Sequence, residues 1–189
     1  MRVLLVVYDN DMYINVFPMG LASIAAVLLR EGHDVEIYNQ DKYHYPDEHL
    51  TEYLDRNKFD VIGLGIIAGY YQYRKLLKIS DAINRAKNRP FYVIGGHGPS
   101  PYPGFFLRKT KADAVVIGEG EMTIVELLQA VQSHKSLNSV KGIAYMEGEK
   151  VVINERFSLI EDINTLPFPA YELFPIEDYR MRRPVLSTN

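Results

Sequence analysis

The sequence predicts an α/β fold with a doubly wound parallel sheet, and two observations support this. Five short apolar runs alternate with segments of helical periodicity, and no two of these five runs form a hairpin. Because parallel strands need crossover helices, this alternation indicates one sheet that is covered by helices on both faces. We therefore expect five parallel strands in a flavodoxin-like (Rossmann-type) order, 2-1-3-4-5.

Four segments make up the first half of this unit. Residues 2–8 (RVLLVVY) form a β-branched run that ends at acidic residues, as expected for a strand buried on both faces. Residues 18–30 place apolar side chains at helical spacing after a proline in the first turn. Residues 33–39 alternate as a short edge strand does, and residues 47–56 predict a short helix.

The second half continues the alternation. Residues 60–67 (DVIGLGII) are the predicted third strand, and an amphipathic helix is expected over about residues 71–87. Residues 91–94 and 112–117 are the fourth and fifth strands, and glycine follows each of them. Residues 123–131 form the last helix of the series.

The chain divides into three predicted parts. Residues 1–136 are expected to fold as the α/β domain. Residues 137–156 contain two short apolar runs around the turn EGEK, which predicts a β-hairpin extension. Residues 157–189 contain four prolines and little periodicity, so we expect an extended linker there rather than a second core.

The composition excludes several classes of function. The 189 residues carry 21 basic and 24 acidic side chains, a net charge of −3, so no basic field exists to bind nucleic acid or an anionic membrane. The absence of cysteine excludes a disulfide framework, a thiolate nucleophile and a cysteine-ligated zinc or iron–sulfur site within these residues. The N-terminal apolar run is too short for a signal sequence or a membrane span, so we expect a cytoplasmic protein.

Polar and glycine-rich loops follow the predicted strands at one edge of the sheet. In such sheets the ligand lies beyond the carboxyl ends of the strands, where the strand order reverses between strands one and three. The loop of residues 9–17 is long and polar and has room for a ligand. An ordinary solvent-exposed turn would explain its composition equally well. The glycines after strands three, four and five would let a large ligand approach backbone N–H groups. They are Gly69, Gly95, Gly96, Gly98, Gly118 and Gly120.

Other motifs do not support a second function. Residues 63–68 match a dinucleotide fingerprint as letters, but their glycines lie inside the third strand. No Walker loop, no phosphorylatable aspartate after strand three and no G-x-S-x-G element is present. His44, His49 and His97 have no carboxylate at ligand spacing, so each is expected to be a satisfied or solvated histidine. We expect neither a metal site nor a catalytic residue in this chain.

Several stretches of the chain form a pattern that resembles a known family. They are Pro18-x-Gly20-Leu21-x-x-Ile24-Ala25-x-x-Leu28, Asp60-Val61-Ile62-Gly63-Leu64, Gly95-Gly96-His97-Gly98-Pro99 and Ala114-Val115-Val116-Ile117-Gly118-Glu119-Gly120-Glu121. Together they resemble the N-terminal cobalamin-binding domain of cobalamin-dependent radical SAM enzymes. The stretches Ile163–Tyr171, Tyr179-Arg180 and Pro184–Asn189 resemble the segment that leads into the radical SAM barrel of those enzymes.

The resemblance implies cobalamin as the cofactor and a barrel of the same parent chain as the partner. The parent would be a radical SAM methyltransferase or cyclase that acts on an unreactive carbon, with [4Fe–4S] and S-adenosylmethionine in the barrel. The stretch present here would not be catalytic by itself. The implied cobalamin-binding residues are Asp9, Asn10, Asp11, Met12 and Tyr13 below the corrin; Gly65, Ile66, Ile67, Ala68, Gly69, Tyr70, Gly95, Gly96, His97, Gly98 and Pro99 beside the nucleotide tail; and Gly118, Glu119, Gly120 and Glu121 at the closing loop.

Two positions depart from corrinoid proteins in which a histidine ligates cobalt. Those proteins carry an Asp-x-His-x-x-Gly loop, whereas the loop from Asp9 to Tyr13 contains no histidine, so we expect cobalt without a protein imidazole. Gly65 stands where those proteins use a serine for the nucleotide tail. These departures leave two alternatives open: a non-catalytic domain of the same fold that has lost cobalamin, and a nucleotide- or flavin-binding domain.

Overall fold

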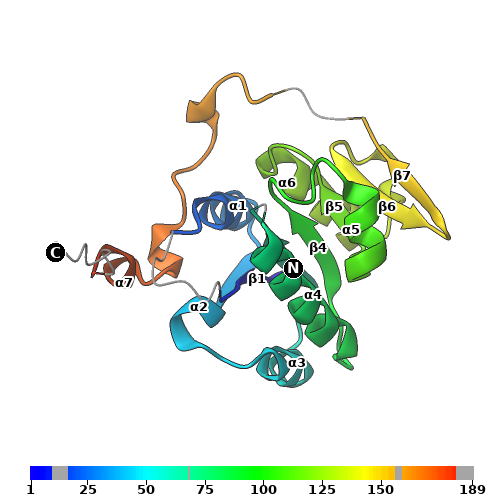
Figure 1. Ribbon diagram of the computed structural model, residues 1–189. Coiled ribbons are helices and arrows are strands. Elements are labelled where there is room, and N and C mark those ends of the chain that lie inside the picture. Colours follow the sequence, from blue (N-terminus) through cyan, green and yellow to red (C-terminus); the bar gives the residue numbers. More distant parts are fainter. Residues whose placement is uncertain (10–16, 68, 156–158, 182–189) are drawn as a thin grey trace, which may run out of the picture.

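The computed structural model describes residues 1–9, 17–67, 69–155 and 159–181. Its centre is a seven-stranded sheet with the order β2-β1-β3-β4-β5-β6-β7 (Figure 1). The strands are β1 (Arg2–Val7), β2 (Asp34–Asn39), β3 (Val61–Gly65), β4 (Phe91–Gly95), β5 (Ala114–Val116), β6 (Ile143–Glu147) and β7 (Lys150–Ile153). The first five are parallel, which confirms the predicted order.

The predicted hairpin belongs to the same sheet. Strand β6 pairs antiparallel with β5, and β7 pairs antiparallel with β6. Ile143 and Ala144 of β6 are fully buried, so the hairpin gains its stability from the domain core. The extension that the sequence predicts is therefore the continuation of one sheet from five to seven strands.

Helices cover both faces of the sheet (Figure 1). Helices α1 (Met19–Arg30) and α6 (Glu121–Gln132) pack on one face. Helices α3 (Asp47–Arg56), α4 (Tyr70–Arg85) and α5 (Pro103–Thr110) pack on the other. Helix α5 and the four-residue α2 (Gln40–Tyr43) were not predicted from the sequence, because both are too short to show a clear period.

The side chains of the strands alternate between the two helical layers. Leu4 and Ile62 face α3, α4 and α5, whereas Val3 and Val61 face α1 and α6. Gly63 lies on the α1 side, and a Cβ atom there would come within 2.8 Å of Leu5 Cδ2. The first glycine of the apparent dinucleotide fingerprint therefore serves packing inside the sheet.

The C-terminal residues are less extended than the sequence indicates. They include the 3₁₀ turns Ile163–Thr165 and Tyr171–Leu173 and the helix α7 (Ile176–Met181). The main-chain N–H of Ala170 donates to the carbonyl oxygen of Ala22 in α1 at 3.0 Å. Phe174 is only 6% exposed and packs against Val7 and Ala22. The tail thus covers part of the sheet beside α1 (Figure 1). The sequence did not predict this packing, because the aromatic residues of the tail follow no regular spacing.

Among the residues that the structure describes, no helix has the length and apolar character that crossing a membrane requires.

Candidate functional site

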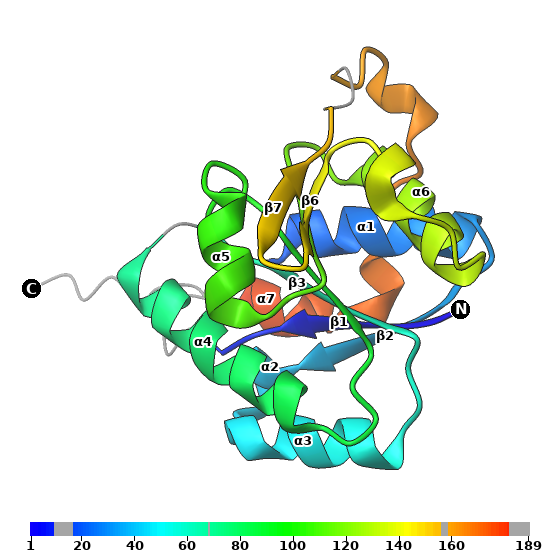
Figure 2. The same ribbon diagram turned by 90° about the vertical axis from the view of Figure 1, so that its right-hand side faces the viewer.

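The loops that carry the candidate site meet at the carboxyl edge of the parallel strands. Strands β1 and β3 are neighbours, yet the helix after β1 covers one face of the sheet and the helix after β3 covers the other. This arrangement is the reversal point at which ligands bind in open α/β sheets. In the side view of Figure 2, the chain begins at the opposite end of β1.

The loop after β4 crosses closely over the end of β3. Gly96 has a φ of +94°, and a Cβ atom there would lie 2.6 Å from the carbonyl oxygen of Ile66. That carbonyl accepts a hydrogen bond from the N–H of Gly98 at 3.1 Å, and the N–H of Ile66 donates to Gly95 at 2.9 Å. Gly96 is therefore required by a close backbone crossing.

Ser100 links this loop to the loop after β5. Its hydroxyl donates to the carbonyl oxygen of Gly96 at 2.8 Å and accepts from the N–H of Gly118 at 3.2 Å. Sequence reasoning missed Ser100, because a single serine in a Gly/Pro-rich loop carries no distinctive signal. The structure makes it the residue that holds two glycine loops in a fixed relation.

Gly65 and Gly95 expose backbone on the sheet face that carries α1 and α6. They are register partners at the ends of β3 and β4. A Cβ atom at Gly65 would lie 3.7 Å from Leu21 Cδ2, and one at Gly95 would lie 3.5 Å from Val116 Cβ, both ordinary contacts. Packing therefore does not require glycine at either position. Because both residues are glycine, the space that two Cβ atoms could occupy stays open, and a large ligand can approach the backbone there. We call this open space at Gly65 and Gly95 the cradle.

The closing loop and the first turn of α6 border this cradle. Gly118 has a φ of +80° and open space around its Cβ position. Glu119 accepts a hydrogen bond from the main-chain N–H of Ile160 at 2.8 Å, so its carboxylate is engaged with the C-terminal segment. The hydroxyl of Thr123 is fully buried and has no hydrogen-bond partner among the described residues. A buried hydroxyl without a partner is a candidate to form a hydrogen bond with a ligand atom.

Exposed apolar side chains surround the same edge. They lie in the loops and first helical turns after β1, β3, β4 and β5, and Tyr71 is 79% exposed. The set is Met19, Ile67, Tyr70, Tyr71, Tyr102, Phe105 and Met122. Clusters of this kind mark binding surfaces in soluble proteins. Tyr73 differs, because it packs against Phe105 and Phe106 as part of the core.

A buried polar network lies at the β1 and β2 end of the edge. Asp9 Oδ2 is 2.6 Å from His44 Nδ1, and the N–H of Asp9 donates to Gln40 Oε1 at 3.3 Å. Gln40 Nε2 donates to Asp47 Oδ1 at 2.8 Å, and Lys75 Nζ also donates to that oxygen at 2.8 Å. Burial alone would raise the pKa of Asp47, but the hydrogen bonds from Lys75 and Gln40 lower it overall.

The structure brings most of the predicted residues to this edge, but their roles differ. Ile66 is 2% exposed and turns into the core, so it offers only backbone, and Pro99 is also buried. Ile67, Gly69, Tyr70, His97 and Glu119 are exposed. Asn10, Asp11, Met12, Tyr13 and Ala68 lie outside the described residues. Within the described ranges, no group of three or more metal-ligating side chains is present.

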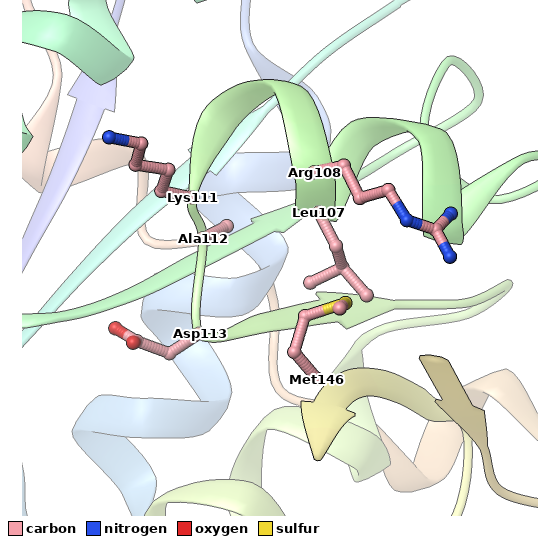
Figure 3. Close-up of a pocket in the computed structure, with 6 residues that line it drawn as sticks. All are labelled: Leu107, Arg108, Lys111, Ala112, Asp113 and Met146. Atoms are coloured by element: carbon pink, nitrogen blue, oxygen red, sulfur yellow. The ribbon is translucent and has the colours of Figure 1, made fainter. Parts of the chain in front are cut away.

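The hollow in Figure 3 is distinct from this edge. It has a volume of about 360 Å³ and is lined by Leu107, Arg108, Lys111, Ala112, Asp113 and Met146. Asp113 precedes β5, so the hollow lies at the amino ends of the strands. The Asp113 carboxylate is already bonded to Arg89 Nη1 at 2.8 Å and to the N–H of Tyr92. We assign this hollow no part in the site.

Comparison with known proteins identifies the family. Residues 2–128 match the model of the B12 binding domain. The chain belongs to the B12-binding domain family. This result confirms the family that the sequence resembles, and it disfavours a flavin- or nucleotide-binding domain.

Relatives of this B12-binding domain are longer enzymes. It is 30% identical over 165 residues to an uncharacterized methyltransferase of Pyrococcus horikoshii, covering 86% of this chain and 35% of the relative. It is 24% identical to an anaerobic magnesium-protoporphyrin IX monomethyl ester cyclase of Synechocystis, covering 86% of this chain and 32% of the relative. The chain thus spans about a third of these relatives.

Solved structures show the same fold. The cobalamin-dependent S-adenosylmethionine radical enzyme OxsB with aqua-cobalamin bound aligns with a TM-score of 0.77 at 20% identity, over 96% of this chain and 25% of that one. The radical S-adenosylmethionine methyltransferase TsrM of Kitasatospora setae, with cobalamin and a [4Fe–4S] cluster bound, gives a TM-score of 0.70 at 19% identity, over 89% of this chain and 31% of that one.

Proposed function

We propose that this B12-binding domain holds cobalamin at the carboxyl edge of β1, β3, β4 and β5. The observation that carries the proposal is the cradle of Gly65 and Gly95. The side chains nearest to these two positions, Leu21 and Val116, would leave room for a Cβ atom, so packing does not require glycine there. The buried hydroxyl of Thr123 adds a polar group that a ligand could satisfy. A chain under no such requirement would gain stability from side chains at these strand positions.

Different residues of this edge would contact different parts of cobalamin. The backbone of Gly65 and Gly95 would face the nucleotide tail, with residues 96–99 beside it and residues 118–121 closing the loop. The exposed apolar set after the strands would contact the ring and exclude water from it. The loop that begins at Asp9 would lie below the ring, and residues 10–13 would contribute no imidazole, because they include no histidine.

Cobalamin, when bound, supplies a redox-active cobalt centre that can carry a methyl group. The parent protein would be a radical SAM methyltransferase or cyclase acting on an unreactive carbon. Its [4Fe–4S] cluster and S-adenosylmethionine would reside in a barrel of the same chain. The names of the longer relatives and of the structural neighbours support this proposal.

A graded series at one glycine tests the cradle. Gly65→Ala and Gly65→Val add increasing volume where a Cβ atom meets only ordinary contacts, so the domain should stay folded. Hydroxocobalamin affinity, measured by absorbance titration, should fall progressively along the series. Ile153→Thr on the exposed face of β7 is the control and should bind as the original chain does. Equal affinity in the folded Gly65→Val variant would contradict the cradle.

The same titration decides between the proposal and a domain that has lost cobalamin. A folded original chain that remains colourless after reconstitution would support the non-binding alternative.

A further inference from the structure

A cluster of aromatic side chains beside β2 has no part in the proposed cobalamin site. It consists of tyrosines and one histidine from β2, α2, α3 and the connection between these two helices: Tyr38, Tyr43, Tyr45, His49 and Tyr53. We call these residues the tyrosine cluster. Its outer end adjoins the carboxyl edge of the sheet, because Tyr43 is followed by His44, whose ring contacts Asp9 at 2.6 Å.

The rings of the cluster connect a buried phenol to the surface. The ring centroid of Tyr38 is 5.8 Å from that of Tyr45. Tyr45 stacks in turn on Tyr43, with centroids 5.3 Å apart and an interplanar angle of 23°. Tyr38 is 4% exposed, whereas Tyr43 is 54% exposed. A continuous series of ring contacts therefore leads from Tyr38 to solvent.

Tyr38 has a proton acceptor at hydrogen-bond distance. Its hydroxyl oxygen lies 2.8 Å from His49 Nδ1, within the reach that proton transfer between two side chains requires. Tyr45 stacks on His49 with centroids 4.2 Å apart, which fixes the plane of the imidazole. Imidazole is the side chain that gains and loses a proton near neutral pH. Burial raises the pKa of Tyr38, so its phenol keeps its proton until an electron is removed.

Elsewhere in the domain a buried tyrosine is satisfied differently. Tyr92 is fully buried, and its hydroxyl lies 2.8 Å from that of Ser80, which is not a base at neutral pH. In the tyrosine cluster, by contrast, Tyr53 also has a proton acceptor, because its hydroxyl donates to Glu36 Oε1. Its ring centroid is 5.4 Å from that of Tyr38. Two phenols in contact thus each have a base in place, which packing alone does not require.

We propose that Tyr38 and His49 form a redox-active pair, which gives up one electron to an outer-sphere one-electron oxidant at the surface. The electron leaves Tyr38 through the rings of Tyr45 and Tyr43, and the phenolic proton moves to His49 Nδ1. The products are a neutral tyrosyl radical, an imidazolium and the oxidant reduced by one electron, so atoms and charge balance. An oxidising equivalent that arises at the carboxyl edge would be drawn away from it along this route.

Flash photolysis with EPR detection tests the pair without cobalamin, so the result is independent of the proposed function. The chain is produced with ¹⁵N-histidine and mixed with tris(bipyridine)ruthenium(II) and chloropentaamminecobalt(III), an irreversible electron acceptor. A light flash then generates the ruthenium(III) oxidant, and the sample is frozen rapidly. We expect a tyrosyl radical whose pulsed EPR spectrum contains a ¹⁵N coupling, because the radical oxygen of Tyr38 is hydrogen-bonded to the labelled ring of His49.

Variants assign the radical to the pair. Tyr38→Phe keeps the ring and removes only the hydroxyl, so the ¹⁵N-coupled radical should disappear. His49→Gln should remove the coupling, and Tyr43→Leu, which interrupts the ring contacts, should lower the yield of the coupled radical. The matched control is Tyr92→Phe, which removes a buried hydroxyl with a serine partner and should keep the coupled radical in full.

The redox-active pair is overturned by several results. They are the absence of a radical in the original chain, a radical without ¹⁵N coupling, and a coupled radical that survives in Tyr38→Phe or is lost in Tyr92→Phe. An unchanged yield of the coupled radical in Tyr43→Leu would overturn the route through the rings. The ¹⁵N coupling in the original chain decides the assignment even where a variant does not fold.

Discussion

The backbone of Gly96 passes so close to that of Ile66 that a Cβ atom at position 96 would lie 2.6 Å from the Ile66 carbonyl oxygen. The loop after β4 is thereby seated on the end of β3. The positive φ of Gly96 and this crossing both demand glycine, so position 96 has a structural role before it has any role toward a ligand.

Replacing Gly96 should therefore cost stability. Gly96→Ala combines a left-handed backbone with a backbone clash, and strain of this kind costs on the order of 1–3 kcal/mol. The free energy of unfolding from urea titration should fall by about that amount. Gly65→Ala, which meets only ordinary contacts, is the matched control and should lose less than Gly96→Ala. Equal stability of the two variants would show that the loop can move away from Ile66.

Ser100→Ala should separate the loops after β4 and β5. The change removes the hydrogen bonds to Gly96 and from Gly118, which are worth about 1 kcal/mol each in stability. We expect faster amide exchange at Gly118 and weaker cobalamin binding in the folded variant. Ser139→Ala, in the exposed turn before β6, should change neither quantity. Unchanged exchange at Gly118 in Ser100→Ala would contradict the link.

The C-terminal segment should contribute to the stability of the domain. Phe174 is 6% exposed, with its ring centroid 5.3 Å from that of Phe17, so Phe174→Ala should cost about 3–5 kcal/mol. Phe168 in the same segment is 93% exposed, and Phe168→Ala is the control that should leave the free energy of unfolding unchanged. Similar urea midpoints for both variants would mean that the tail does not pack on α1 in solution.

Acid should weaken the network behind Asp9. Hydrogen bonds from Lys75 and Gln40 outweigh burial and hold the folded-state pKa of Asp47 below its ordinary value of 3.8. The stabilising contribution of Asp47 is therefore present above that value and is lost as the pH falls through the folded pKa. Unfolding free energies of the original chain should therefore decline below about pH 4 more steeply than those of Asp47→Asn. Parallel pH profiles of the two proteins would rule out this contribution.

Local pattern predicted the parts of the fold that depend on neighbours in sequence. The predicted helix over residues 47–56 has the same bounds as α3, and the edge strand over residues 33–39 is β2. Helix α5 was missed because it has only eight residues and starts in a Gly/Pro-rich stretch. The strand order followed from the alternation of strands and helices together with the rule for parallel sheets.

The candidate site was only partly predictable, because its decisive contacts join distant residues. Glycines after the strands were visible in the sequence, but whether each one serves packing, as Gly63 does, or leaves space, as Gly65 does, depends on Leu5 and Leu21. The contact between Asp9 and His44 spans 35 positions, and the contact between Phe17 and Phe174 joins the residues just before α1 to the C-terminal segment. Neither has a local period or spacing that could reveal it.

Amide exchange of the chain with and without hydroxocobalamin tests both the binding and its place. If cobalamin lies where we propose, one ligand should co-elute with the protein and slow exchange in residues 65–70, 95–99 and 118–121. Residues 107–113, around the hollow at the amino ends of the strands, should exchange at the same rate in both samples. A folded protein that retains no cobalamin, or one whose protection is confined to residues 107–113, would contradict the proposed site.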